Sequence, residues 1–403
     1  MMGKPKIRFK GYNEDWEQRK VSELCSISTG KSNTQDKSED GEYPFYVRSP
    51  IIERSTKYLY DEEAVITVGD GVGTGKVFHY VNGKYDLHQR CYRMYGFSDE
   101  LNVHYFYHTF SKLFYKRVMA MTAKTSVDSV RLEMIADMEI PTPTIEEQIK
   151  IGTYFDQLDH LITLHQHKCD EMKKLKKYML QKMFPQNGKK VPEIRFDGFT
   201  NDWEQRKLGK VLVSLQNNTL SRADLSNETG VAKNVHYGDV LVKFGEVLDV
   251  RRESLPMISD ESVLTKYKAS FLKNGDVIVA DTAEDSTVGK CSEIAGLNDE
   301  VVLSGLHTIP YRPIEKFASG YLGYYLNSSA YHNQLIPLMQ GIKVTSISKS
   351  AMQNTEIIYP KSVEEQGKIG AYFSTLDHLI TLHQHKCDEL QNLKKYMLQN
   401  MFV

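Results

Sequence analysis

A chain of 403 residues is long enough for two or three domains, and its net charge of −1 gives no sign of a free-standing, strongly basic nucleic-acid binder. Either the ligand is not nucleic acid, or partners supply much of the positive charge. The five cysteines form no C-x-x-C pair, and the sequence has neither an apolar N-terminal leader nor a long apolar run. We therefore expect a cytoplasmic protein with no membrane segment.

Two internal repeats define the organisation of the chain. The segment IRFKGYNEDWEQRK from Ile7 returns as IRFDGFTNDWEQRK from Ile194, and DHLITLHQHKCDE from Asp159 returns unchanged from Asp377. The stretches between these repeated segments resemble each other only faintly. Two copies with a shared frame and different contents predict two domains that recognise different ligands and are held on one symmetric scaffold.

The first copy predicts an α+β insert followed by a long helix. We expect strands at 44–47 and 64–68, a hairpin turning at Asn82-Gly83 between strands 76–81 and 84–95, and a helix over 101–121. A short strand at 137–140 precedes two prolines. Apolar residues then recur every three or four positions from Ile145 until Pro185, which predicts one continuous amphipathic helix of about 38 residues.

The second copy repeats this order with a longer insert. Strands are expected at 240–244, 276–280, 289–294 and 301–311, with a helix near 321–339. The segment Glu364-Glu365-Gln366 matches Glu146-Glu147-Gln148 and opens a second long helix. Two near-identical long helices with apolar seams can pair antiparallel about a pseudo-twofold axis and so separate the two inserts.

No catalytic or cofactor motif emerges from the sequence. The loop from Gly69 to Lys76 lacks the spacing of a phosphate-binding loop, so no nucleotide cofactor is expected. The repeated H-x-H-x-C pattern suggests zinc, but residues two apart on a helix point to opposite faces, which favours polar seam positions and no metal. The chain is therefore expected to be non-catalytic.

Basic and amide side chains interleaved with aromatic residues are candidates for DNA contact, because Arg and Gln can read base edges and Lys can position phosphates. An ordinary exposed strand is the competing interpretation of each residue, so only the set is suggestive. The candidates are Arg48, Lys76, His88, Gln89, Arg90, Arg93, Lys124, Lys290 and Lys343.

Apolar residues on the basic ends of the two long helices are candidates for partner contact, since they extend around the helix beyond one seam. Favourable interaction of the lysines with the helix dipole is the simpler account of the charges. The candidates are Tyr178, Met179, Met183, Phe184, Tyr396, Met397 and Met401.

The duplicated D-W-E-Q-R-K frame, the Pro followed by E-E-Q before each long helix, the L-K-K-Y-M-L-Q-x-M-F endings and the F-P-Q linker resemble the specificity subunit of type I restriction-modification enzymes. The resemblance covers the whole chain. It implies two α+β target-recognition domains separated by two long antiparallel helices, which bind a bipartite asymmetric target in double-stranded DNA. It also implies recruitment of methyltransferase subunits and restriction or translocase subunits, without catalysis by the chain itself.

We divide the chain accordingly. An N-terminal conserved segment (1–24) precedes the first recognition domain (25–143) and the central helix (144–185); a linker with the second conserved segment (186–211) precedes the second recognition domain (212–360) and the C-terminal helix (361–403). Two alternatives come from other classes: an autonomous nuclease with fused recognition domains, and a metal-binding coiled-coil scaffold.

Overall fold

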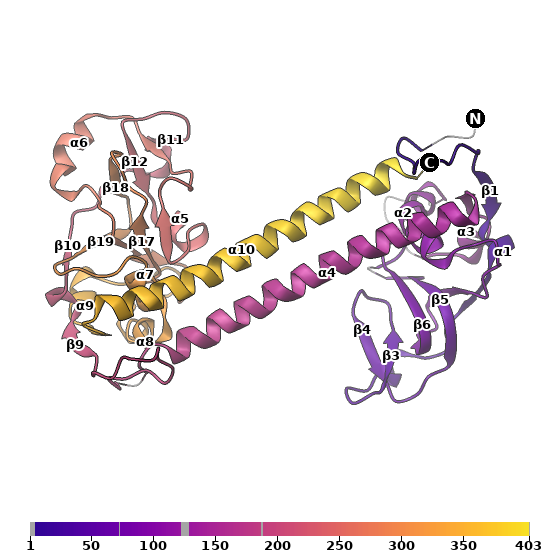
Figure 1. Ribbon diagram of the computed structural model, residues 1–403, viewed down its shortest axis with the longest axis horizontal. Helices are drawn as coiled ribbons and strands as arrows, with labels where there is room; N and C mark the ends of the chain where they lie inside the picture. The colour runs from indigo at the N-terminus through magenta and orange to yellow at the C-terminus, as the bar shows by residue number, and fades with distance from the viewer. Residues whose placement is uncertain (1–4, 72, 122–128, 187, 403) are drawn as a thin grey trace. The chain divides into compact units, whose positions relative to one another are not determined.

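The computed structural model describes residues 5–71, 73–121, 129–186 and 188–402 (Figure 1). The chain divides into two compact units: unit 1 comprises Met1–Gln166 with Gln384–Val403, and unit 2 comprises His167–His383. Two α-helices of 38 residues each, α4 (Ile145–Lys182) and α10 (Val363–Asn400), contribute to both units. Both helices carry two glutamates in the first turn, where carboxylates interact favourably with the helix dipole. The predicted long helices are confirmed.

Unit 1 is built from a six-stranded sheet, a two-stranded sheet and flanking helices. Its strands are β1 (Glu17–Lys20), β2 (Ser26–Thr29), β3 (Tyr43–Tyr46), β4 (Ile52–Ser55), β5 (Tyr60–Val68), β6 (Phe78–Leu87), β7 (Cys91–Tyr95) and β8 (Glu139–Thr142). Its helices besides α4 and α10 are α1 (Val21–Leu24), a 3₁₀ helix (Thr34–Asp36), α2 (Val103–Met121) and α3 (Leu132–Ala136).

Unit 2 has the same kinds of element and two further sheets. Its strands are β9 (Glu204–Lys207), β10 (Leu212–Ser214), β11 (Leu225–Ser226), β12 (Ala232–Val235), β13 (Val247–Asp249), β14 (Met257–Ile258), β15 (Val277–Ala280), β16 (Thr282–Ala283), β17 (Cys291–Ala295), β18 (Val302–Ser304), β19 (Thr308–Pro313), β20 (Thr345–Ser346) and β21 (Glu356–Tyr359). Its helices are α5 (Tyr237–Val242), α6 (Ser262–Tyr267), α7 (Tyr321–Asn327), α8 (Ser329–His332) and α9 (Lys349–Gln353), with 3₁₀ helices at Leu208–Lys210, Arg222–Asp224, Lys268–Ser270 and Ile336–Leu338.

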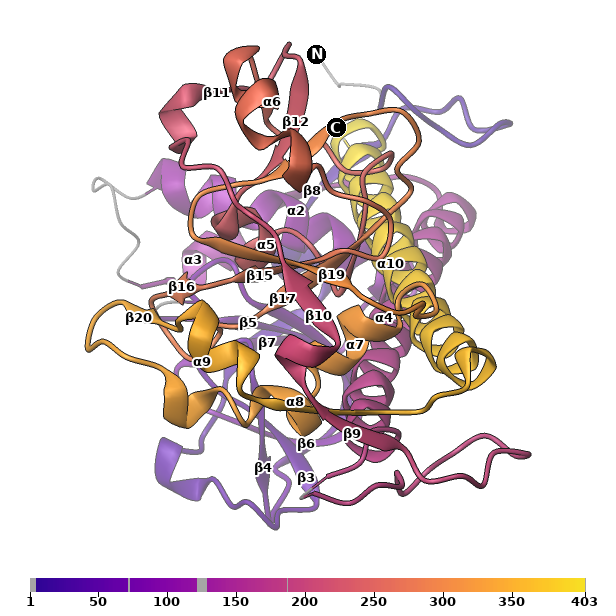
Figure 2. The ribbon, with the colours of Figure 1, turned by 90° about the vertical axis from the view of Figure 1, so that its left-hand side faces the viewer.

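The two units share a central sheet of the same topology. Its order is β2-β7-β5-β6 in unit 1 and β10-β19-β15-β17 in unit 2, and the next strand runs parallel to its neighbour in both, β3 beside β6 and β13 beside β17 (Figure 2 shows unit 2). A short antiparallel pair joins each repeated Trp segment to the strand before the long helix, β1 with β8 and β9 with β21. The faint kinship of the two inserts is therefore structural, and the α+β internal repeat is confirmed.

The extra residues of unit 2 form a second sheet on this shared core. Its order is β11-β14-β12-β18, and it encloses a separate small apolar cluster around Ile258, Tyr267 and Leu303. Unit 1 has no counterpart within its described residues; it adds β4, which pairs with β3. The longer second insert is thus an addition at one side of a common sheet.

Within each unit, the parts of α4 and α10 run antiparallel and make the same contacts. Lys394 Nζ lies 2.5 Å from Asp159 Oδ1 in unit 1, and Lys176 Nζ lies 2.6 Å from Asp377 Oδ1 in unit 2. Asp159 and Asp377 are equivalent in the repeat, as are Lys176 and Lys394. The antiparallel pairing expected from the duplicated helices is therefore present twice.

Several local predictions were wrong. The strand expected at 84–95 is interrupted between β6 and β7, and the strand expected at 301–311 is divided into β18 and β19. Residues 82–83 do not turn: Gly83 adopts φ 121° inside β6, which pairs with β5 along its length. Residues 240–244 belong mostly to α5, because their apolar side chains pack on one side against the sheet. The expected helix at 321–339 breaks into α7, α8 and a 3₁₀ helix, since Ser328 is extended and Pro337 cannot continue an α-helix.

Candidate functional site

The repeated Trp segment is fixed to the long helix in each unit by a buried arginine-glutamate pair. Arg8 donates to both carboxylate oxygens of Glu147 at 2.7 Å, and Arg195 donates to those of Glu365 at 2.7 and 2.9 Å. The two glutamates are 0% and 2% exposed. A bidentate pair of this kind fixes the orientation of the Trp segment relative to the long helix. This contact explains why the arginine and the glutamate recur in both copies of the repeat.

The glutamine that follows each buried glutamate ties the insert to the helix. Gln148 donates to the carbonyls of Glu100 and Pro143 and accepts from the Asn102 amide. Gln366 makes the equivalent bonds, donating to the Pro360 carbonyl and accepting from the Ala318 amide. Each E-E-Q motif therefore places the insert at a defined position relative to the first turns of its helix.

At the end of β5 in unit 1, three predicted residues come together. Asp70 Oδ1 lies 3.3 Å from Arg48 Nη1, and Asp70 Oδ2 lies 3.8 Å from Arg90 Nε. The neighbouring Gln89 donates to the Asn33 side chain, and both Gln89 and Arg90 are exposed. The carboxylate holds two guanidinium groups at the surface without burying them, which leaves their remaining donors available to a ligand.

His88 supports the loop that carries Gln89 and Arg90 from its buried side. Its Nδ1 accepts from the Arg90 amide at 3.0 Å, and its Nε2 lies 3.4 Å from the Thr34 hydroxyl. Burial, followed by the nearby charge of Arg48, lowers the pKa of the His88 imidazole. The buried ring supports the backbone of the loop that carries Gln89 and Arg90 and does not itself face solvent.

The other candidates in unit 1 lie apart from this cluster. The Arg93 guanidinium is 12% exposed, pairs with Glu62 and lies between the rings of Tyr60 and Tyr95, 4.0 and 3.7 Å from their centroids. Lys76 is exposed, with its ammonium 4.7 Å from the Tyr115 ring. Lys124 lies outside the described residues. Arg93 therefore packs on the sheet, whereas Lys76 is accessible.

Unit 2 has the same loop geometry with different side chains. The Asp281 amide donates to the His307 carbonyl at 3.1 Å, as the Gly69 amide does to the Arg90 carbonyl at 2.8 Å, so His307 occupies the position of Arg90. The Ile347 amide in turn donates to the Asp281 carbonyl at 2.8 Å. At this end of the central strands, the two units therefore present different side chains on the same backbone arrangement.

The two predicted lysines of unit 2 differ in exposure. Lys290 is half-buried and donates to the Leu241 carbonyl at 2.8 Å, and burial lowers the pKa of its ammonium. Lys343 is exposed in the loop that precedes β20. Of the two, Lys343 is the one available to a large ligand.

The candidate partner residues divide into exposed and buried sets. Tyr178 and Tyr396 are equivalent in the repeat and are 50% and 56% exposed. The remaining residues pack wholly or partly into the cores: Met179, Met183 and Phe184 in unit 2, and Met397 and Met401 in unit 1. Only the two tyrosines present a large free surface.

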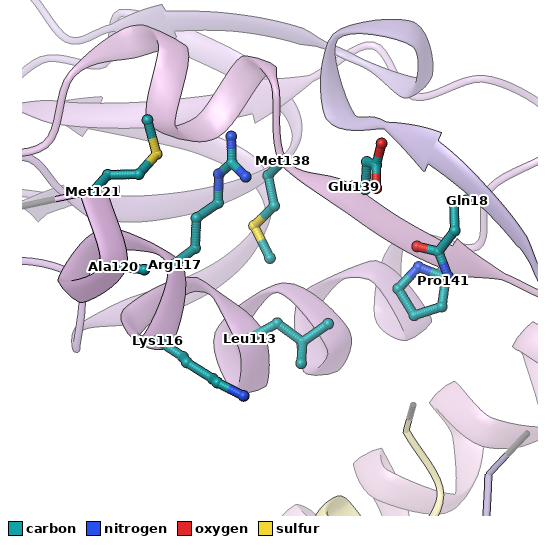
Figure 3. A pocket seen from close by; sticks show the side chains of 9 residues that line it. All are labelled: Gln18, Leu113, Lys116, Arg117, Ala120, Met121, Met138, Glu139 and Pro141. Carbon is teal, nitrogen blue, oxygen red and sulfur yellow. The ribbon is translucent and has the colours of Figure 1, made fainter. Parts of the chain in front are cut away.

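A groove of about 420 Å³ lies in unit 1 between α2 and the β1–β8 pair (Figure 3). Leu113, Met121 and Met138 supply apolar surface, and the Arg117 guanidinium donates to the Met134 carbonyl at 2.8 Å. The equivalent groove of unit 2 is about 290 Å³ and is lined on one side by Pro185, Gln186 and Gly188 of the linker. Neither groove contains an acid, base and nucleophile arranged for catalysis.

Metal and membrane sites are not found in the part of the chain that the structure describes. No three His, Cys, Asp or Glu side chains there lie close enough to hold a metal ion. No described helix combines the length and apolar character needed to cross a bilayer. The five cysteines are buried.

Sequence reasoning missed the groups that position the exposed arginines. Asp70 stands in the glycine-rich loop that lacks the spacing of a phosphate-binding loop, and the signal that could identify it is its position two residues after the buried end of β5. Asp281 and His307 were also missed, because only pairing of β15 with β19 brings them together.

The comparisons with known proteins agree with this geometry. The family described as type I restriction modification DNA specificity domain matches residues 13–174 and 200–392. The MjaVIII type I restriction enzyme specificity subunit of Methanocaldococcus jannaschii is 24% identical over 406 residues, covering 96% of this chain and 91% of that protein. The EcoDI specificity subunit of Escherichia coli is 20% identical over 295 residues, covering 73% of this chain and 59% of that protein.

Two solved structures have a similar fold. The crystal structure of the S subunit of a type I restriction-modification system from M. genitalium has a TM-score of 0.67 at 13% identity and covers 100% of this chain and 99% of its own. A chain from a structure on complex assembly and conformational transition of the type I system has a TM-score of 0.52 at 17% identity, with 98% and 99% coverage.

Proposed function

Because the chain belongs to the family of type I restriction modification DNA specificity domains, we propose that it is the specificity subunit of a type I restriction-modification complex. In this role it binds a bipartite, asymmetric sequence in double-stranded DNA and assembles with methyltransferase and restriction subunits. The observation that carries the proposal is the duplicated family domain, whose shared core presents different side chains at equivalent loops. Different side chains at one position predict different half-sites.

We assign recognition of one half-site to residues 25–143 and of the other to residues 212–360. In the first, Arg48, Gln89 and Arg90 are the base-reading candidates, because they are exposed and Asp70 orients both guanidinium groups. Arginine reads guanine and glutamine reads adenine through paired hydrogen bonds in the major groove. Lys76 and Lys343 would contact phosphates, whose binding is independent of sequence.

Assembly is assigned to the repeated segments 1–24, 144–185, 186–211 and 361–403. Tyr178 and Tyr396 carry exposed aromatic surface at equivalent positions, and aromatic residues are enriched in protein interfaces. The chain supplies recognition, whereas the chemistry belongs to its partners. The buried free thiols of Cys25, Cys91 and Cys291 fit the reducing conditions of the cytoplasm, where its DNA target would lie.

The decisive experiment maps methylated motifs in cells with and without this chain. The expected result is one bipartite motif that disappears when the chain is removed. With Arg90→Ala, methylation should become tolerant at one position of one half-site, while the other half-site stays unchanged. Equal relaxation of both half-sites would contradict the assignment of one half-site to each unit.

An autonomous nuclease is the competing function, and it is tested on the purified chain. Incubation with target DNA and Mg²⁺ should leave the DNA intact unless partner subunits are added. Cleavage by the chain alone would overturn the proposal in favour of the nuclease.

A further inference from the structure

Ile342 is the most exposed large apolar residue among the described parts of the chain. Its relative exposure is 102%, compared with 88% for Val242, the next in rank. It stands in the loop between the 3₁₀ helix Ile336–Leu338 and β20. Single exposed apolar residues are common on protein surfaces, so exposure alone does not mark a site. The construction of the loop supplies the further observations.

Backbone contacts hold the base of this loop in place. Gln340 and Ser346 exchange amide-carbonyl bonds of 2.9 and 2.8 Å, and β20 pairs with β16. Ile347 is 3% exposed and is bonded to the Asp281 carbonyl. The Ile342 side chain therefore projects from a fixed platform.

Gly341 shapes the tip itself. It adopts φ 120°, and a Cβ atom built there would lie 1.9 Å from the Val344 carbonyl oxygen. No other residue fits without moving the loop backbone. The tight turn directs the Ile342 side chain into solvent, and Lys343 follows it directly in the chain.

The anchored segment formed by β20 and Ile347 lies at the end of β15, which is the position that the arginine cluster occupies at the end of β5 in unit 1. Asp281, which anchors Ile347, is the counterpart of Gly69, and His307 is the counterpart of Arg90. The exposed Lys343 and Lys349 add positive charge on either side of the anchored β20 segment. An aliphatic tip followed directly by a lysine suits a polyanion whose interior is apolar, which is the chemistry of stacked base pairs.

We propose that Ile342 is an apolar wedge that inserts at a base step of the DNA half-site recognised by unit 2. The inference rests on the proposed function. Isoleucine has no hydrogen-bonding group with which to read a base edge, but inserted aliphatic side chains partially unstack and kink DNA. Unit 2 would thus select its DNA sequence partly by how easily two adjacent base pairs unstack, because pyrimidine–purine steps deform most readily.

The test uses the reconstituted complex and its mapped target, with 2-aminopurine placed at successive positions of the half-site assigned to unit 2. The unmodified complex should raise the fluorescence at one step. Ile342→Ala should abolish that rise and weaken binding about ten- to hundredfold, the range expected for losing burial of one aliphatic side chain. Hydrogen exchange should remain unchanged, because the side chain makes no core contact.

Two matched variants separate the wedge from other effects. Val242→Ala removes a comparably exposed aliphatic side chain on α5 and should change neither binding nor fluorescence. Lys343→Ala should retain the fluorescence rise while weakening binding and reducing the salt dependence by about one ion.

Three outcomes would overturn the wedge alone: no fluorescence rise at any step with the unmodified complex, binding by Ile342→Ala equal to the unmodified complex, or weaker assembly with partner subunits while DNA binding is intact. The last outcome would identify a protein contact. Failure of the unmodified complex to bind any target would instead overturn the proposed function and the wedge with it.

Discussion

Units 1 and 2 share the order of five core strands and the same arginine-glutamate pairs at the frame, yet the loops at one end of these strands carry different side chains. In unit 1 an aspartate holds two exposed arginines, whereas unit 2 places His307 beside Asp281 and projects Ile342 from a braced loop. The difference teaches how a duplicated chain can diverge. Substitution of a residue that holds the frame lowers the stability of the fold, whereas a residue that faces outward can change at little cost.

The largest expected effect concerns the frame. Glu365→Ala should lower the free energy of unfolding of unit 2 by about 3 to 5 kcal/mol, because Arg195, whose side chain is only 12% exposed, loses the carboxylate that it pairs with. Glu147→Ala should cost unit 1 about 1 kcal/mol less, because Glu365 also accepts from the Trp203 indole at 3.1 Å, whereas the Trp16 indole nitrogen has no described partner.

Each unit contains one tryptophan, which makes the measurement specific. Urea unfolding followed by fluorescence in a Trp16→Phe background reports unit 2, and a Trp203→Phe background reports unit 1. Equal losses in the two units would contradict the added role of the Trp203 bond. Loss of less than about 1 kcal/mol in both would contradict the buried pair as the fixing contact.

This frame could be predicted only in part. The sequence repeats identify the segments that hold the two copies, and the three- and four-residue spacing from Ile145 predicts a helix whose end at Lys182 precedes Pro185. The partners of Arg8 and Arg195 lie 139 and 170 positions away, and no local pattern connects residues so distant. Asp281 and His307 were missed for the same reason, since only the pairing of β15 with β19 brings them together.

Local rules failed where the sheet overrode them. Asn82-Gly83 is a strong turn signal in isolation, but the pairing of β6 with β5 continues through Gly83 and Glu62. Residues 240–244 have the composition of a strand, yet their apolar side chains are used by a helix against the sheet. Tertiary packing decides between such alternatives, and a single sequence does not contain it.

The second effect is pH-dependent and belongs to unit 2. Burial raises the pKa of Glu293 to about 7, although the carboxylate accepts from the Gly320 and Gly323 amides at 2.6 and 3.0 Å. A carboxyl whose pKa is raised in the folded state stabilises the fold below its ordinary pKa of 4.5, and this stability is lost as the pH rises through about 7. Unit 2 should therefore lose up to about 3 kcal/mol between these limits.

Unfolding of the Trp16→Phe chain between pH 4.5 and 8 measures the unit 2 trend. Glu293→Gln, which cannot titrate, should flatten it. An unchanged slope in Glu293→Gln would assign the pH dependence to other groups.

The smallest expected effect compares the two equivalent lysines of the paired helices. Lys176 is 14% exposed and lies 2.8 Å from Glu246 and 2.6 Å from Asp377, whereas Lys394 is 24% exposed and contacts Asp159. Lys176→Met should cost unit 2 about 2 kcal/mol, because it leaves two partly buried carboxylates side by side. Lys394→Met should cost unit 1 about 1 kcal/mol or less, as for a more exposed ion pair.

The same fluorescence backgrounds measure this pair of variants, and adding Glu246→Gln to Lys176→Met provides the control. The double variant should recover about half of the loss, because one of the two facing charges is removed. Two results together would contradict this account: an equal loss in the free energy of unfolding for Lys176→Met and Lys394→Met, and no recovery of that loss in the double variant. They would mean that the methionine side chain replaces the packing of the lysine, and that Glu246 does not make the helix pair of unit 2 differ from that of unit 1. Recovery would instead show how an insert that differs between the copies changes the energetics of a helix segment that does not.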